Sequence, residues 1–146
     1  GLPTIDREKY APASGVARGA YVLHDASGGG VPDIILLASG SEVALAMEAH
    51  ERLVSEGVRS RLVNMASMRL FEQQDADYRE SVLPPSCSTR LAVEAGVSFG
   101  WERWTGDGGQ VIGVDHFGAS APAGVLFEQF GFTADAVYAR AKALLA

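Results

Sequence analysis

The chain has 146 residues, of which 47% are hydrophobic and 21% charged, and its formal net charge is −6 at pH 7. This length suits one globular domain, large enough to bury roughly two thirds of the surface of its unfolded chain. The negative charge argues against a nucleic acid partner, because phosphate binding usually needs a basic face. No apolar run approaches the length of a membrane span, and no secretory signal is visible, so we expect no membrane partner.

The first elements in chain order are a linker and two strands. Residues 1–19 are polar and punctuated by prolines, so we expect a linker from a preceding domain that is missing. Residues 20–24 form a short strand, and the glycine-rich loop after it is too short for a helical crossover. We therefore expect this strand to lie antiparallel at a sheet edge, beside the next strand at 33–38. The five apolar residues 34–38 are typical of a strand buried on both faces of a parallel sheet.

A helix follows over about residues 41–56, with one apolar stripe and with Gly57 as its stop. Ser39, with Glu42 three residues later, fits a capping box, in which side chains satisfy the free amides of the first turn. Gly40 allows the backbone to turn sharply between strand and helix. This strand and helix form the first half of a βαβ unit.

The rest of the chain adds further strands and helices. We expect parallel strands near 59–65, 90–95 and 110–115, a loop through 67–71 and a short acidic helix near 75–81. Pro122 lies in the first turn of the next helix, and Thr133 caps the last one. The predicted fold is an α/β domain of three layers, with a five-stranded mixed sheet of four parallel strands and one antiparallel edge strand.

The turn at Ser39, Gly40 and Ser41 is the first candidate site. It lies at the carboxyl end of a parallel strand and at the amino end of a helix, where open α/β sheets bind anions. A nucleophile elbow needs Gly-x-Ser-x-Gly, and neither serine has both glycines. A plain helix cap and a functional anion site both fit the pattern.

Phe99, Trp101 and Trp104 form an aromatic cluster after the strand at 90–95. The cluster fits either the core or a docking surface, because bulky aromatic residues are enriched at the centres of interfaces. We expect the cluster and the helix that begins near Ser120 to border an interface. That interpretation predicts an exposed Trp101 or Trp104 in this chain.

Gly106-Asp107-Gly108 resembles the opening of the metal–diphosphate motif of thiamine-dependent enzymes. That motif needs an Asn downstream, whereas Asn64 is the only Asn of the chain and lies upstream. The segment therefore predicts a surface turn with no metal.

The remaining reactive side chains predict no catalytic, cofactor-binding or metal site. Cys87 is the only cysteine, which excludes an internal disulfide and any multi-cysteine zinc site and favours a cytoplasmic location. It has no histidine nearby in sequence to act as its base. His24, His50 and His116 have no spacing that indicates a shared metal, and His50 fits a packed or half-exposed helix residue.

Several blocks of the chain together resemble the end of transketolase, and the resemblance spans essentially all 146 positions. The blocks, in order, are Leu2-Pro3-Thr4, Asp6-Arg7, Lys9-Tyr10, Ala38-Ser39-Gly40-Ser41-Glu42-Val43, Val82-Leu83-Pro84-Pro85, Ala92-Val93-Glu94-Ala95-Gly96, Ser98-Phe99-Gly100-Trp101, Phe117-Gly118-Ala119-Ser120-Ala121-Pro122 and Phe130-Gly131-Phe132-Thr133. The resemblance implies that residues 20–146 are the third, carboxyl-terminal domain of a transketolase, whose sheet has four parallel strands and one antiparallel strand. Pyruvate dehydrogenase-type and deoxyxylulose phosphate synthase enzymes carry related domains, but the Ser-Phe-Gly-Trp and Phe-Gly-Ala-Ser-Ala-Pro blocks favour transketolase.

The resemblance also implies a function for the parent enzyme, which is cytoplasmic. It moves a two-carbon ketol unit between sugar phosphates in the pentose phosphate pathway, using thiamine diphosphate and Mg²⁺ or Ca²⁺. In that family the cofactor and the activating glutamate belong to the first two domains, and no residue here matches a catalytic position. The chain itself is then a non-catalytic scaffold without a cofactor, and its partners are the other two domains and a second subunit of a homodimer. The alternative is a small-anion or effector-binding module that uses the turn from Ser39 to Glu42.

Overall fold

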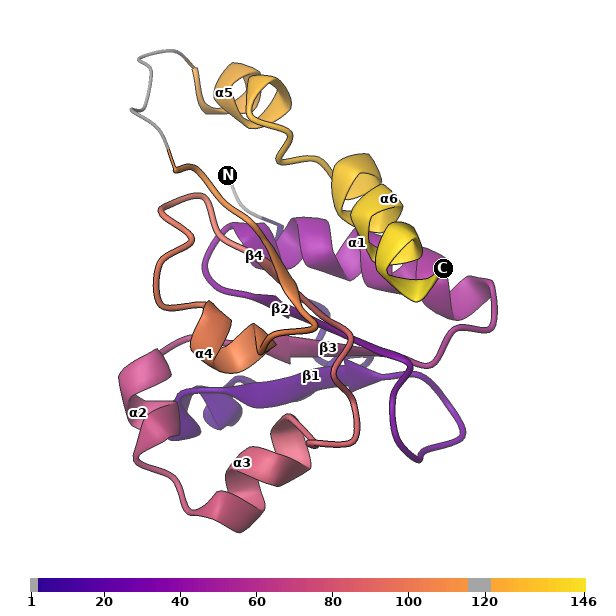
Figure 1. Cartoon of the computed structure of the whole chain (residues 1–146), viewed down its shortest axis with the longest axis vertical. Coiled ribbons are helices and arrows are strands. Elements are labelled where there is room, and N and C mark those ends of the chain that lie inside the picture. The colour runs from indigo at the N-terminus through magenta and orange to yellow at the C-terminus, as the bar shows by residue number, and fades with distance from the viewer. Residues whose placement is uncertain (1–2, 116–121) are drawn as a thin grey trace.

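The computed structural model describes residues 3–115 and 122–146, which form a five-stranded sheet with helices on both faces (Figure 1). The strand order is β1-β3-β2-β4-β5. The bounds of the strands are β1 Tyr21–Asp25, β2 Ile34–Ala38, β3 Ser60–Asn64, β4 Arg90–Val93 and β5 Gln110–Ile112. The predicted three-layer α/β fold, with four parallel strands and one antiparallel edge strand, is confirmed.

The centre of the sheet is β2, whose five residues are all buried. It pairs in parallel with β3 and β4, so that Leu37 faces Val63 on one side and Ala92 on the other. β4 pairs in parallel with β5. β4 and β5 are shorter than predicted, because their pairing ends at Val93 and Ile112, and β3 is one residue shorter at each end.

The position of β1 is the main correction to the predicted topology. β1 is an antiparallel edge strand, as expected, but it pairs with β3 and not with β2. The loop between β1 and β2 crosses the amino end of β3: the Ala26 amide donates to the Ser60 carbonyl at 3.1 Å, and the Asp33 amide donates to the Arg59 carbonyl at 2.8 Å. A loop too short for a helical crossover excludes a parallel neighbour, but it still leaves room for one strand in between.

One face of the sheet carries long helices and is called the long-helix face below. Its helices are α1 Glu42–Ser55 and α6 Ala134–Leu145, and the alternate β2 residues Ile34, Leu36 and Ala38 pack in the same core cluster as their buried side chains. The Thr133 hydroxyl accepts a hydrogen bond from the Ala136 amide at 3.1 Å, so the predicted cap of α6 is confirmed. Gly57, with φ of +84°, ends α1 as predicted.

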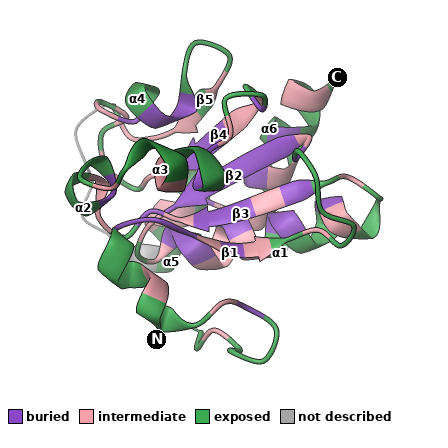
Figure 2. Ribbon diagram, turned by 90° about the horizontal axis from the view of Figure 1, so that it is seen from below, coloured by how far each residue is buried: buried purple, intermediate pink, exposed green. Residues whose placement is uncertain are grey.

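The other face carries short helices and is called the short-helix face. They are α2 Met68–Glu72, α3 Ala76–Val82 and α4 Glu102–Thr105, and their buried side chains share a second core cluster with Ile35 and Leu37. The predicted acidic helix is α3, whereas α2 and α4 lie where loops were expected. Figure 2 shows the buried interior of the sheet between the exposed outer surfaces of the helices.

Segments on either side of these layers complete the described chain. Tyr10 is buried against the long-helix core, and the Ala11 amide donates to the Leu23 carbonyl at 2.9 Å. The 3₁₀ helix η1 Ala13–Arg18 leads into β1, and α5 Ala123–Gln129 precedes α6. The assignment of residues 1–19 as a linker stays a prediction. No helix in the described ranges has the length and apolar character needed to span a bilayer.

Candidate functional site

The turn at Ser39, Gly40 and Ser41 joins β2 to α1, but its bonds are not those of a capping box. The residue before the helix is Ser41, whose hydroxyl donates to the Glu42 carboxylate and caps no amide. The Glu42 amide donates to the backbone carbonyl of Ser39 at 3.2 Å. Gly40 has φ of +56°, which glycine adopts at little cost. The capping-box prediction is therefore wrong, because a backbone carbonyl takes the place of the Ser39 hydroxyl.

A cavity of about 170 Å³ lies beside this turn, between the start of the chain and the first turns of α1. Ile5, Val43 and Met47 make much of its lining apolar, and no Lys or Arg contributes to it. The nearby Glu42 side chain is buried, and its negative charge opposes anion binding. Anion binding at this turn stays a prediction.

The aromatic cluster divides into two buried residues and one exposed residue. Trp101 and Trp104 expose only 2% and 6% of their surface, so the expectation that one of them is exposed is wrong. Both belong to the α4 turn, which folds back onto the sheet, and the Trp101 indole Nε1 donates to Glu94 at 3.2 Å. Phe99, by contrast, is 86% exposed, and Val97 is 63% exposed beside it. Ser120 lies outside the described residues, and the helix expected near it, α5, begins at Ala123.

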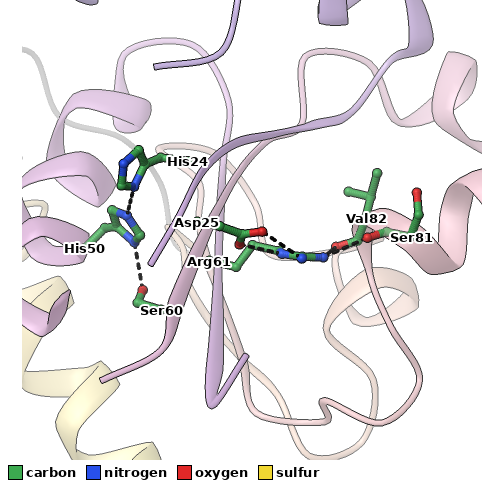
Figure 3. Close-up of polar contacts among 7 residues, drawn as sticks. All are labelled: His24, Asp25, His50, Ser60, Arg61, Ser81 and Val82. Atoms are coloured by element: carbon green, nitrogen blue, oxygen red, sulfur yellow. Dashed lines mark hydrogen bonds and ion pairs between the residues drawn. The ribbon is translucent and has the colours of Figure 1, made fainter. Parts of the chain in front are cut away.

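Two histidines that sequence reasoning kept apart lie together between β1 and α1 (Figure 3). The Nδ1 atom of His24 and the Nε2 atom of His50 are 2.8 Å apart, and the other ring nitrogen of His50 is 2.8 Å from the Ser60 hydroxyl. His50 is fully buried. Burial, followed by the charge of His24, lowers the pKa of His50 to about 4. His50 is therefore neutral at physiological pH, and its ring nitrogens are both used in hydrogen bonds.

The burial of His50 could have been read from the helix period, since Val43, Ala46, His50 and Leu53 follow each other at spacings of three and four residues. Its pairing with His24 has no such signal. No group of three His, Cys, Asp or Glu side chains able to hold a metal occurs within residues 3–115 and 122–146. His116 lies outside these ranges.

A second polar cluster ties the start of the chain to α1. The Lys9 ammonium lies 2.5 Å from the Glu51 carboxylate, and the Tyr10 hydroxyl also donates to Glu51. The bonds from Lys9 and Tyr10 lower the pKa of Glu51, while burial and Glu51 raise the pKa of Tyr10. These contacts hold a helix and a loop together and leave no free base for catalysis.

Arg61 makes the contacts on the right of Figure 3. Its guanidinium donates to both carboxylate oxygens of Asp25, at 2.7 and 2.8 Å, and to the carbonyls of Ser81 and Val82, at 2.7 and 3.1 Å. One side chain thus joins β1, β3 and the end of α3. The role that these contacts support is structural.

Arg90 plays a similar part at the start of β4. It donates to the carbonyls of Cys87, Trp104, Leu83 and Pro84 at distances between 2.8 and 3.2 Å. Cys87 itself is buried, and this burial raises the pKa of its thiol. A protonated, buried thiol is a poor nucleophile, which agrees with an incidental loop cysteine.

The Gly106-Asp107-Gly108 segment is a turn between α4 and β5, and Asp107 is exposed. The prediction of a surface turn is confirmed. None of the sites described so far combines a nucleophile, a base and an oxyanion donor.

The comparisons with known proteins agree with this description. A model of the transketolase-like C-terminal domain family matches residues 19–133. Transketolase 1 of Escherichia coli (strain K12) is 52% identical over 130 residues, which are 89% of this chain and 19% of that protein. The solved transketolase from Leishmania mexicana has a TM-score of 0.81 and 41% identity, over 90% of this chain and 18% of that one.

A mutant transketolase from Pichia stipitis, solved as a complex with xylulose-5-phosphate, has a TM-score of 0.81 and 32% identity over 94% of this chain and 19% of that one. The chain thus spans about a fifth of the length of these relatives. Fold, motifs and family model lead to one assignment. The chain belongs to the transketolase-like C-terminal domain family.

Proposed function

We propose that this chain is the carboxyl-terminal domain of a larger transketolase, in which it serves as a non-catalytic scaffold. The parent enzyme transfers a two-carbon ketol unit between sugar phosphates of the pentose phosphate pathway, and it works in the cytoplasm. Its thiamine diphosphate and its Mg²⁺ or Ca²⁺ are held by the other two domains. This domain docks on those domains and on the second subunit of a homodimer.

The observation that carries the docking role is the exposed apolar tip of the loop between β4 and α4. Phe99 and Val97 expose 86% and 63% of their surface there, although solvent exposure of a large aromatic side chain is unfavourable. The relatives are about five times as long as this chain, so further polypeptide is available to cover the tip. We therefore assign the rest of the parent chain as the occupant of this surface.

The described residues do not fit a diphosphate–metal unit, which needs several oxygen ligands around the cation. Asp107 is exposed in a turn, and no group of three metal-binding side chains accompanies it in the described ranges. Glu94, the glutamate nearest to the sheet, accepts the hydrogen bond of the Trp101 indole. These features support the assignment of the cofactor to the other domains.

The docking role is tested in the full-length parent with Phe99→Asp, and with Val31→Asp as the control. Val31 is also apolar and 44% exposed, but it lies in the loop before β2. We expect Phe99→Asp to lower the dimer fraction in sedimentation experiments and the ketol-transfer rate at low protein concentration. Val31→Asp should change neither. Equal behaviour of the two variants would contradict the docking role.

The non-catalytic role is tested with the 146-residue chain alone. Calorimetry with thiamine diphosphate and Mg²⁺ should give no binding heat, and a coupled assay with xylulose and ribose phosphates should give no turnover. Micromolar cofactor binding by this chain would overturn the scaffold assignment. In the same chain Phe99→Asp should leave the melting temperature unchanged, because the side chain is exposed.

A further inference from the structure

A cavity of about 200 Å³ opens on the short-helix face, among α2, α3 and α4. Phe71, Leu83 and the Trp104 ring form its apolar part, and the Phe71 and Trp104 ring centres are 5.1 Å apart. The guanidinium-bearing side chains Arg79, Arg90 and Arg103 also line it. A single water occupies about 30 Å³ of the liquid, so the cavity has room for a group larger than one water.

Two residues that line this cavity each carry a buried N–H donor with no acceptor in the described part of the chain. The Trp104 indole Nε1 and the Arg79 Nε have no hydrogen-bond partner among the described residues. Trp104 is 6% exposed, so its indole is shielded from bulk solvent. A buried donor without a partner costs about 1–3 kcal/mol, which makes such groups rare in folded proteins.

The other tryptophan shows what the usual arrangement is. The Trp101 indole, from the same turn of chain, donates to the Glu94 carboxylate at 3.2 Å. The Trp104 indole has no such partner among the described residues, and Arg79, whose Nε also lacks a partner there, lines the same cavity. An acceptor for these donors therefore has to come from outside the described residues.

The charged residues around the cavity favour a ligand with a negative charge. Arg79 forms no side-chain hydrogen bond or ion pair within the described part of the chain. Arg103 is paired with Glu72 at 2.7 Å, and its guanidinium lies 5.2 Å from the Trp104 ring centre. Arg90 donates to four carbonyls, and among the described residues its positive charge has no carboxylate partner. Glu80 is the one acidic residue of the lining.

We propose that this cavity binds a small oxyanion, with phosphate as its chemical group. The Arg79 guanidinium, which has no side-chain partner in the described ranges, donates to the anion, and the charge of Arg90 adds attraction. Arginine suits this task because its guanidinium keeps its charge and donates to more than one oxygen of a phosphate. The site is separate from the Phe99 loop, so it stands independently of the docking role.

The two tryptophans make a direct test possible, because the chain has only two indole N–H resonances. Inorganic phosphate is added to the ¹⁵N-labelled chain at constant ionic strength, and Trp104→Phe assigns the resonances. The Trp104 indole resonance should shift and saturate with a millimolar dissociation constant, about the strength of a few charge-assisted hydrogen bonds. The Trp101 resonance should stay in place, because Glu94 already holds its proton.

Two variants then distinguish a specific phosphate site from general attraction of phosphate to positive charge. Arg79→Gln should weaken binding about tenfold, the effect of one hydrogen bond to a charged group. Arg140→Gln removes the same charge from α6, on the other face of the sheet, and should leave the affinity unchanged. Tighter binding of glycerol phosphate than of inorganic phosphate would support an organic phosphate as the ligand, and equal binding would support free phosphate.

Two results would overturn the proposal. One is a Trp104 indole resonance that does not move up to about 50 mM phosphate in a folded chain, which would leave water as the partner of both donors. The other is equal weakening by Arg79→Gln and Arg140→Gln, which would show attraction to net charge without a site. The full ¹H–¹⁵N spectrum of each variant shows whether it is folded.

Discussion

The two faces of the sheet are stabilised in different ways. On the long-helix face, helices of 14 and 12 residues lie on the sheet, and the fully buried His50 has partners on both ring nitrogens. On the short-helix face, helices of four to seven residues leave a cavity and two buried donors without partners. Cavities of about 170 Å³ and 200 Å³ lie beside the long-helix and the short-helix face, but both unpartnered donors found in the described ranges belong to the short-helix face.

The difference follows from the ends of helices. Each helix leaves its last carbonyls without partners inside the helix, and in a helix of one or two turns these are most of its carbonyls. Arg61 donates to the carbonyls of Ser81 and Val82, and Arg90 donates to those of Leu83 and Trp104. On this face arginine side chains therefore pair with the free carbonyls at the ends of short helices, and each arginine carries a positive charge.

The largest expected loss of unfolding free energy comes from substitutions at adjacent residues of β2, which point to opposite faces of the sheet. Leu36 belongs to the long-helix core and Leu37 to the short-helix core, and both are fully buried. Replacement of either by Ala should cost about 2–5 kcal/mol of unfolding free energy, because each leaves a cavity. Leu37→Ala should lie at the lower end, since short helices can relax into the space. Urea melts measure the unfolding free energy of both variants. A larger loss for Leu37→Ala than for Leu36→Ala would contradict the idea that the short-helix face relaxes more easily.

The second effect concerns the arginine that binds four carbonyls. Arg90→Gln should lower the unfolding free energy by roughly 2–4 kcal/mol, because several buried carbonyls lose their donor. Arg69→Gln is the matched control, since Arg69 is exposed on α2. It should change the stability by no more than about 0.5 kcal/mol. Equal losses in the two variants would show that the Arg90 contacts contribute nothing specific.

The third effect is a pH dependence that belongs to the long-helix face. The pKa of His50 falls from an ordinary 6.5 to about 4, so between these values the unfolded chain binds a proton that the folded chain does not. Stability should therefore be complete above pH 6.5 and fall as the pH drops towards 4, by about 3 kcal/mol in total. His24 and Lys9 strengthen the lowering, while Asp25 and Glu51 oppose it.

His50→Gln separates this histidine from the rest of the chain. The variant keeps hydrogen-bonding atoms but does not titrate, so its stability should change much less between pH 6.5 and 5. Hydrogen bonds lower the pKa values of the carboxyls of Asp33, Glu51 and Glu56, whose contributions are lost at lower pH. An unchanged slope in His50→Gln would assign the pH dependence to other groups.

The smallest effect concerns the caps of the two long helices. Thr133→Ala should cost about 0.5–2 kcal/mol, because its hydroxyl caps α6. Ser39→Ala was expected from the sequence to cost as much, but no hydroxyl of this turn caps α1, so the change should stay within about 0.5 kcal/mol. Thermal melts of both variants measure the difference. A clear loss of stability in Ser39→Ala would show that the Ser39 hydroxyl does cap α1.

Much of the fold could be predicted because the signals were local. Five apolar residues define β2, the helix period defines α1, and Gly57 and Thr133 mark helix ends. The neighbour of β1 could not be predicted, because β2 and β3 offer similar apolar strands and nothing in the sequence states which one pairs. α2 and α4 were missed because five and four residues are too few to show a helical period.

The candidate sites show the same limit. Trp101 and Trp104 are three residues apart, a helical spacing that could have placed both on one buried face. The pair of His24 and His50 and the pair of Arg79 and Trp104 join distant parts of the chain, so only the folded structure reveals them.

The pairing of β1 with β3 also has a consequence for synthesis. β1 leaves the ribosome first, but the strand beside it ends at Asn64, so β1 waits unpaired until that segment has been made. Such a delay is the cost of non-local pairing. Until β3 has been made, β1 presents Tyr21 and Leu23, which are buried in the folded chain, to other nascent chains, which makes this strand the place where aggregation would begin.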